Sequence, residues 1–116
     1  MVAALYADTL LGAVGNARVL EYRFAMWGDD EARALASALP LAERVEELDL
    51  FGNPDIGQQG LDALAAALRA GAAPRLRRFK MQSDWDQPKG RELRAACRER
   101  SIEVHIFGKD ARRFVS

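Results

Sequence analysis

The chain has 116 residues, enough for one domain, and it is 49% hydrophobic and 29% charged, a balance typical of a globular protein and not of a disordered one. Its single cysteine, Cys97, excludes an internal disulfide framework and a zinc site built from several cysteines, and it favours a reducing, intracellular compartment. The net charge is zero, but residues 1–68 hold four basic and eleven acidic residues while residues 69–116 hold thirteen basic and six acidic ones.

The opening segment, residues 1–17, predicts a helix. Apolar residues cluster from Leu10 to Val14 and end at Gly15 and Asn16. The segment lacks the basic region of a signal peptide, and no run in the chain approaches the roughly 18 apolar residues of a membrane span. We therefore expect an N-terminal helix or cap on a soluble protein.

The next segment predicts a strand followed by a helix. Val19, Tyr22 and Phe24 are the apolar positions of the strand, and a helix with Leu35 and Leu39 on its buried side comes after it. Three acidic residues open this helix, where the helix dipole favours negative charge. We interpret them as dipole partners, with one of the first two as the cap, and not as metal ligands; they are Asp29, Asp30 and Glu31.

Residues 45–76 form the clearest strand, turn and helix unit of the chain. Apolar residues alternate with acids from Val45 to Leu50, which predicts a short strand with one buried face. Asn53 lies in the turn, where its side chain can hydrogen-bond neighbouring backbone. From Gly57 onward leucines follow helical spacing, so a helix is predicted up to the stop at residues 71–74.

The same unit recurs downstream. Residues 76–82 predict a third strand, with Phe79 at the position of Leu48, and residues 90–97 predict a helix. A last strand at residues 101–107 places Val104 at the same position. Strands joined through helices run parallel, so we expect the order αβαβαβαβ with a parallel sheet.

These residues resemble leucine-rich repeats of the ribonuclease-inhibitor type. The resemblance is carried by LDLFGN at residues 48–53, by IGQQGLDALAAAL at residues 56–68 and by the linker GAAPRL at residues 71–76. It implies an α/β solenoid with about four parallel strands on a concave face and helices on the convex face, used to bind another protein. The alternative is a compact α/β domain of the STAS type, because residues 48–68 also resemble the strand, loop and helix of that family.

On this reading residues 1–116 are a single domain. Residues 1–17 are the N-terminal helix or cap, residues 18–106 are the repeats, and residues 107–116 are a C-terminal tail. The apolar amino end and the tail either fold back as caps of the stack or are covered by another chain. The charge asymmetry then makes one end of the stack acidic and the other basic, which would suit an acidic protein surface or a second copy.

Equivalent positions on neighbouring parallel strands lie side by side, about 4.8 Å apart, so the repeat predicts columns of side chains. The first column is Arg23, Asp49, Lys80 and His105. The second is Ala25, Phe51, Gln82 and Phe107, and the third is Glu21, Glu47, Arg78 and Glu103. Alternating charges in the first column can form an exposed ladder of ion pairs within the chain. Alternatively, exposed Phe51 and Phe107 among these charges anchor a partner protein.

The remaining candidate groups point away from catalysis. His105 is interpreted as a surface residue of the first column, and Cys97 as a buried structural thiol with no base beside it. Trp85 either covers the edge of the core or meets a partner, and its flanking aspartates lack the later glutamate of a calcium loop. No glycine-rich nucleotide motif is present, and acids dilute the basic cluster at residues 75–80, which disfavours nucleic acid.

The sequence thus predicts a non-enzymatic protein-interaction module without cofactor or metal. Its candidate partner-binding residues are Arg23, Asp49, Phe51, Lys80, Gln82, Trp85, His105 and Phe107. The alternative is a structural accessory subunit, built permanently into a larger assembly that covers its apolar ends.

Overall fold

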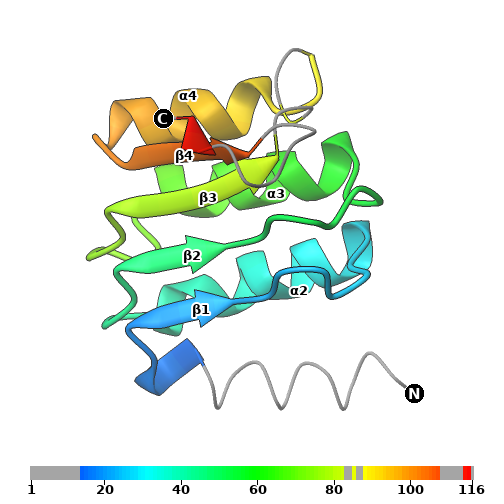
Figure 1. The fold of residues 1–116 in the computed structure, drawn as a ribbon. Coiled ribbons are helices and arrows are strands. Elements are labelled where there is room, and N and C mark those ends of the chain that lie inside the picture. The colour runs from blue at the N-terminus through cyan, green and yellow to red at the C-terminus, as the bar shows by residue number, and fades with distance from the viewer. Residues whose placement is uncertain (1–13, 83–84, 86–87, 108–113, 116) are drawn as a thin grey trace.

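The computed structural model describes residues 14–82, 85, 88–107 and 114–115. Strand β1 (Val19–Glu21) leads to helix α2 (Asp29–Ala38) and the short 3₁₀ helix η1 (Leu39–Leu41). The chain continues through β2 (Glu47–Asp49), α3 (Gln58–Arg69), β3 (Arg78–Gln82) and α4 (Arg91–Glu99), and then through β4 (Glu103–Phe107) and β5 (Phe114–Val115). The described part of the chain is therefore a small, compact α/β domain (Figure 1).

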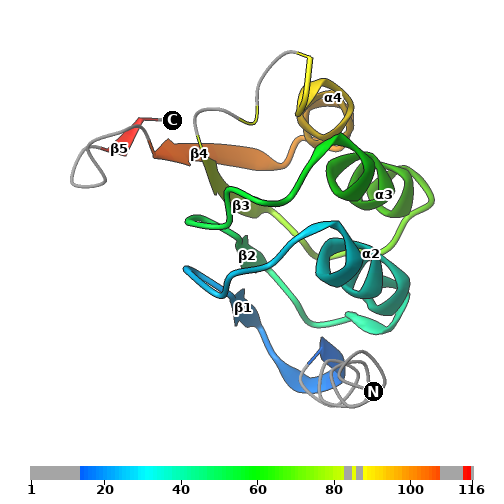
Figure 2. The ribbon, with the colours of Figure 1, turned by 90° about the vertical axis from the view of Figure 1, so that its right-hand side faces the viewer.

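The sheet follows the order of the chain. Strands β1 to β4 are parallel neighbours, as the sequence predicts for strands joined through helices, and β5 pairs antiparallel with β4. Helices α2, α3 and α4 lie together on one side of the sheet (Figure 2). Ile106 pairs with Val115 and Phe107 with Phe114, so this part of the predicted tail folds back onto the last parallel strand.

Two of the three predicted strand registers are confirmed, and one is wrong. Phe79 lies beside Leu48 and Val104 as expected. In β1, however, Leu20 lies beside Leu48 in the position predicted for Tyr22. The same register continues past the strand, because the Tyr22 N–H donates to the Asp49 carbonyl at 2.9 Å.

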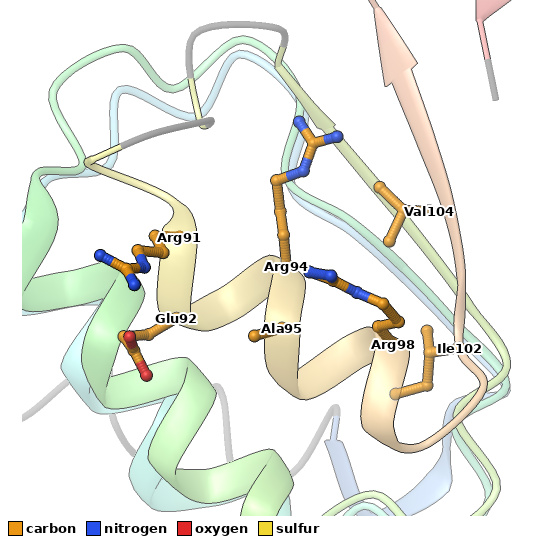
Figure 3. Close-up of a pocket in the computed structure, with 7 residues that line it drawn as sticks. All are labelled: Arg91, Glu92, Arg94, Ala95, Arg98, Ile102 and Val104. Atoms are coloured by element: carbon orange, nitrogen blue, oxygen red, sulfur yellow. The ribbon is translucent and has the colours of Figure 1, made fainter.

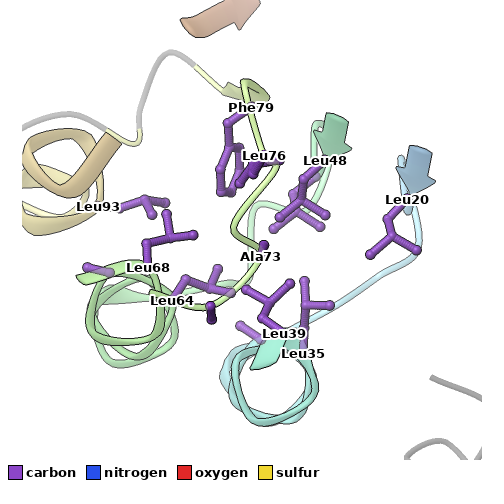
Figure 4. Close-up of a cluster of buried hydrophobic side chains, with 14 of the residues drawn as sticks. Leu20, Leu35, Leu39, Leu48, Leu64, Leu68, Ala73, Leu76, Phe79 and Leu93 are labelled. Atoms are coloured by element: carbon purple, nitrogen blue, oxygen red, sulfur yellow. The ribbon is translucent and has the colours of Figure 1, made fainter. Parts of the chain in front are cut away.

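The core lies between the sheet and the helices. Leu20, Leu48 and Phe79 point from the strands toward the helices (Figure 4). From the helix side the core receives fully buried leucines, which are Leu35, Leu39, Leu64, Leu68 and Leu93. Trp85 is also fully buried, which confirms the interpretation that it covers the edge of the core. These burials supply the main favourable free energy of folding, at roughly 25 cal/mol for each Å² of apolar surface.

Asn53 ties the first strand–helix unit to the second. Its side-chain oxygen accepts hydrogen bonds from the N–H groups of Ala25 (3.1 Å) and Trp27 (3.0 Å). Its side-chain nitrogen donates to the carbonyls of Tyr22 and Leu50, both at 2.9 Å. The amide is fully buried and uses both of its atoms, which confirms the predicted role of this turn residue in bonding nearby backbone.

Asp29 caps a helix, but not the one it opens. The residue before α2 is Gly28, whose N–H donates to Glu31 Oε1 at 2.7 Å. Asp29 Oδ1 instead accepts from the N–H groups of Gly57 (2.7 Å) and Gly60 (2.9 Å) at the start of α3. The expectation that Asp29 or Asp30 caps its own helix is therefore wrong, because the carboxylate satisfies the unpaired donors of the neighbouring helix.

Candidate interaction surface

The sheet has one side against the helices and a second side that, in the described residues, carries mostly polar side chains. We call this second side the sheet face. It consists of two columns defined by the strand register. The first is Val19, Glu47, Arg78 and Glu103, and the second is Glu21, Asp49, Lys80 and His105. The sheet face corrects two predicted positions, since Val19 replaces Glu21 in one column and Glu21 replaces Arg23 in the other.

Ion pairs link the columns of the sheet face across three strands. Arg78 lies between two acids, with its Nη1 3.1 Å from Glu47 Oε1 and its Nε 3.3 Å from Glu103 Oε1. Lys80 Nζ lies 3.2 Å from Glu47 Oε2, and His105 Nε2 contacts Glu103 Oε1. A ladder of ion pairs therefore exists, but it centres on Arg78 of the third predicted column, and Lys80 and His105 of the first column pair with its acids. Partly exposed pairs of this kind stabilise a fold by roughly 0 to 1 kcal/mol each.

The ladder sets the charge of its acids. Burial acts to raise the pKa of Glu47, but hydrogen bonds from Lys80 and Arg78 together with their charges outweigh it, so the pKa lies below its ordinary value. The hydrogen bond with His105, and after it the contact with Arg78, lowers the pKa of Glu103. Both acids therefore stay ionised at neutral pH and keep the ladder charged.

Asp49 behaves differently from the acids beside it. Its carboxylate is fully buried, with Oδ1 accepting from the Phe51 N–H at 3.1 Å and Oδ2 lying 3.3 Å from Arg23 Nε. Desolvation raises the pKa of Asp49 even though the Phe51 N–H and the Arg23 charge act in the opposite direction. This buried carboxylate holds Arg23 at the edge of the sheet face.

The loop after β1 places exposed apolar side chains next to the sheet face. We call Arg23, Phe24 and Met26 the β1 loop. Phe24 and Met26 are 66% and 88% exposed, and both have left-handed backbone, with φ of 53° and 59°. Such conformations are costly for residues other than glycine, and they gather at functional sites.

Aromatic contacts hold the β1 loop in place. The Phe24 ring meets the Phe51 ring edge to face at 5.4 Å between centroids, and the Arg23 guanidinium lies 5.5 Å from the Phe51 ring. Gly52 makes room for this arrangement. A Cβ on Gly52 would lie 2.3 Å from Phe24 Cδ1, and its φ of 84° is itself in the glycine region. The loop therefore presents Phe24 in a defined position.

The structure brings several of the predicted site residues together but leaves few of them accessible. Lys80 and His105 lie side by side as predicted, and Arg23 reaches Asp49 through its side chain although it is not in that column. Phe51 is only 8% exposed, so the expectation of an exposed aromatic is wrong there, because Arg23 and Phe24 cover it. Asp49, Gln82, Trp85 and His105 are buried as well.

Two of the predicted partner-binding residues remain more open to solvent, and one falls partly outside the described residues. Arg23 is exposed and Lys80 is partly exposed. Phe107 pairs with Gln82 in the predicted register, but its side chain lies outside the described part of the chain. A partner contact by any of these residues stays a prediction, and the exposed surface lies elsewhere on the same side.

The sequence pattern does not predict the most exposed part of this surface. Alternation with Tyr22 assigns Phe24 to the core, and no pattern singles out Met26. The sequence signal for this exposed segment is the neighbouring Trp27, which is buried and stacks on Tyr22 at 4.5 Å between ring centroids. A large aromatic so close in sequence could have indicated that the chain turns there and exposes its neighbours.

Cys97 is buried on the helix side of the fold. Burial raises the pKa of the Cys97 thiol to about 12, which confirms a buried thiol and leaves it protonated at neutral pH. In the described ranges no group of three or more potential ligands could hold a metal ion. Within those same ranges, no helix combines the length and apolar character that crossing a membrane requires.

Comparisons of this chain with protein-family models, with curated proteins and with solved structures find no match.

Proposed function

We propose that this chain is a non-enzymatic protein-interaction module, built as a short leucine-rich repeat of the ribonuclease-inhibitor type, and that it binds its partner through the sheet face and the β1 loop. The observation that carries the proposal is the position of the three helices on one side of a parallel sheet (Figure 2). Sequential strand order with helices on one side favours the repeat architecture over the STAS-like alternative.

A parallel sheet in an ordinary α/β protein is covered on both sides, and its strands are apolar throughout. Here the strands alternate. Leu48 and Phe79 face the helices, while Glu47 and Arg78 face the other way and form ion pairs. A charged second face suits water or a polar protein surface, and repeat proteins use such strand faces for binding.

The β1 loop adds the apolar anchor that a polar face lacks. Aromatic residues, methionine and arginine are enriched in protein interfaces, and Phe24, Met26 and Arg23 supply one of each. The fixed position of Phe24 reduces the entropy that binding must remove. The partner we infer is a protein surface with an apolar pocket for Phe24 and Met26, beside polar groups that meet the ladder.

Affinity capture with the immobilised domain tests this proposal. The informative variant is Phe24→Ser with Met26→Ser, because both side chains are exposed and neither belongs to the buried core cluster. The matched control is Leu41→Ser, since Leu41 is 55% exposed but lies in η1, directly after α2. We expect a protein captured by the wild type and by the control to be lost with the double variant. Equal capture by all three would remove the β1 loop as a binding site.

A structural accessory subunit is the second candidate, and the groove at the end of the stack described below favours it. The sequence adds a second argument for this candidate, because the amino end and the tail are apolar. Leu10 and the Phe114 side chain lie outside the described residues, so cover of these ends by another chain stays a prediction.

A further inference from the structure

The last helix and the last parallel strand form a groove. Its volume is about 680 Å³, and its described lining combines three arginines of α4 with apolar residues beside them (Figure 3). The arginines are Arg91, Arg94 and Arg98, and the apolar residues are Ala95, Ile102 and Val104. Cavities of this size are large enough to bury a ligand or a short peptide segment.

The groove carries a strong positive charge. Arg91, Arg94 and Arg98 follow spacings of three and four residues, so they lie along one side of α4, where like charges destabilise a helix. The acid in the lining, Glu92, does not offset them because Arg69 of α3 already binds it at 2.7 Å. An anionic group in the groove would relieve this repulsion.

Contacts between the preceding helices indicate what kind of group belongs there. In α2 and in α3, an arginine donates a hydrogen bond to an acceptor on the next helix. Arg33 of α2 donates to Gln59 of α3 at 2.9 Å, and Arg69 of α3 donates to Glu92 and Glu99 of α4. Counted from the buried leucines of each helix, Arg91 and Arg98 of α4 stand at the positions of Arg33 and Arg69, so their matching acceptor would be an acid on a further helix.

The apolar part of the groove supports the same conclusion. Val104 lies in the position of Leu48 and Phe79, but it is only partly buried, whereas those two residues are fully buried. A further helix beside α4 would cover Val104 and Ala95 as α3 and α4 cover the earlier strands. Figure 3 shows Ile102 beside Arg98 and Val104 beside Arg94, so one helix could meet apolar and charged side chains together.

We infer that this groove binds an amphipathic helix of a partner protein, with its apolar side against Val104 and Ala95 and with acidic residues against Arg91 and Arg98. The groove is separate from the sheet face. The inference therefore does not rest on binding through the β1 loop, and either can fail alone.

Fluorescence anisotropy with a designed peptide tests the inference. The probe is a labelled helical peptide of about 20 residues, with leucine along one side and glutamate beside it. A second peptide has lysine in place of every glutamate. The groove variant is Arg91→Glu with Arg98→Glu, and the matched control is Arg44→Glu with Arg75→Glu, which makes the same charge change at exposed arginines outside the groove.

We expect the wild type and the control to bind the glutamate peptide and the groove variant to bind it about tenfold or more weakly, a loss of about 1.4 kcal/mol. Binding should also weaken with salt. Circular dichroism of each variant establishes that it is folded.

Four results would overturn the inference. Equal affinity of the groove variant and the control would place the site elsewhere, and equal binding of the lysine peptide would exclude charge recognition. Full displacement of the peptide by inorganic pyrophosphate would indicate a small-anion site. Oligomers of the unliganded wild type that the groove variant abolishes, detected by light scattering, would make a second copy the occupant.

Discussion

At the scale of single residues, Asn53 holds two strand–helix units together by four hydrogen bonds from one buried side chain. Each bond is made to a backbone N–H or C=O group that lies outside strands β1 and β2. Asn53 therefore determines the path of the β1 loop, since Ala25 and Trp27 both donate to it.

Replacement of Asn53 by alanine should destabilise the fold strongly. Asn53→Ala leaves buried backbone groups without a partner, and we expect the free energy of unfolding to fall by about 2 to 4 kcal/mol in urea titrations. Gln58→Ala is the control, because Gln58 is exposed at the start of α3. A loss below about 0.5 kcal/mol for Asn53→Ala would show that water replaces its bonds.

Asp49 predicts a pH dependence. Its folded pKa lies above its ordinary value of 3.8, so the folded state holds the proton more tightly than the unfolded state does. The contribution of Asp49 to stability is therefore greatest below 3.8 and is lost as the pH rises through the folded pKa. Asp49→Asn retains an acceptor for the Phe51 N–H but cannot ionise.

Chemical denaturation of Asp49→Asn and the wild type across this window checks the sign. The free energy of unfolding of the variant should rise relative to that of the wild type as the pH increases above 3.8. Gln58→Ala, at an exposed position and without a change of ionisable group, is the control. A difference that stays constant, or falls, over the window would mean that Arg23 and Lys80 outweigh the desolvation of Asp49.

At the scale of elements, α2 and α3 pack closely because Gly60 has no side chain. A Cβ on Gly60 would lie 2.7 Å from Asp29 Oδ1 and 2.9 Å from the Ala32 Cβ. The first of these contacts would displace the carboxylate that caps α3, and the second would push the two helices apart.

Gly60→Ala should therefore destabilise the domain by about 1 to 3 kcal/mol, although alanine favours a helix more than glycine does. Thermal unfolding of this variant is compared with that of Gly15→Ala, where an added Cβ would meet nothing within 4 Å. A raised melting temperature for Gly60→Ala would show that the helices separate without cost.

The elements were predictable from the sequence to the extent that local pattern determines them. Helix α3, the position of Phe79 beside Leu48 and the buried Cys97 of α4 all follow from apolar spacing. The register of β1 could not be obtained in this way, because Leu20 and Tyr22 are both apolar and the choice depends on Asn53, which is distant in sequence.

The candidate site was predictable only in its charged part. The contacts of Arg78 with Glu47 and Glu103 follow from the two correct registers. The exposure of Phe24 does not follow from alternation, which assigns it to the core, and the left-handed backbone of a non-glycine residue has no signal in the strand pattern; the nearby Trp27 is the one local hint.

At the scale of the whole molecule, the strand order gives the charge asymmetry a direction. The acidic half of the chain builds the β1 end and most of the basic half builds the β4 end, so the domain is electrically polarised along the stack (Figure 1). A polarised domain orients its partners during encounter. The basic end holds the groove of α4, while the β1 loop lies toward the acidic end, so one domain could engage two proteins.

The most direct test of the account is photo-cross-linking with benzoylphenylalanine in place of Phe24, compared with the same group in place of Leu41. Both positions are exposed, and they belong to the β1 loop and to η1. We predict that the group at position 24 cross-links one protein efficiently and that the group at position 41 does not. Cross-links to the same protein from position 41 alone would contradict binding through the sheet face and the β1 loop.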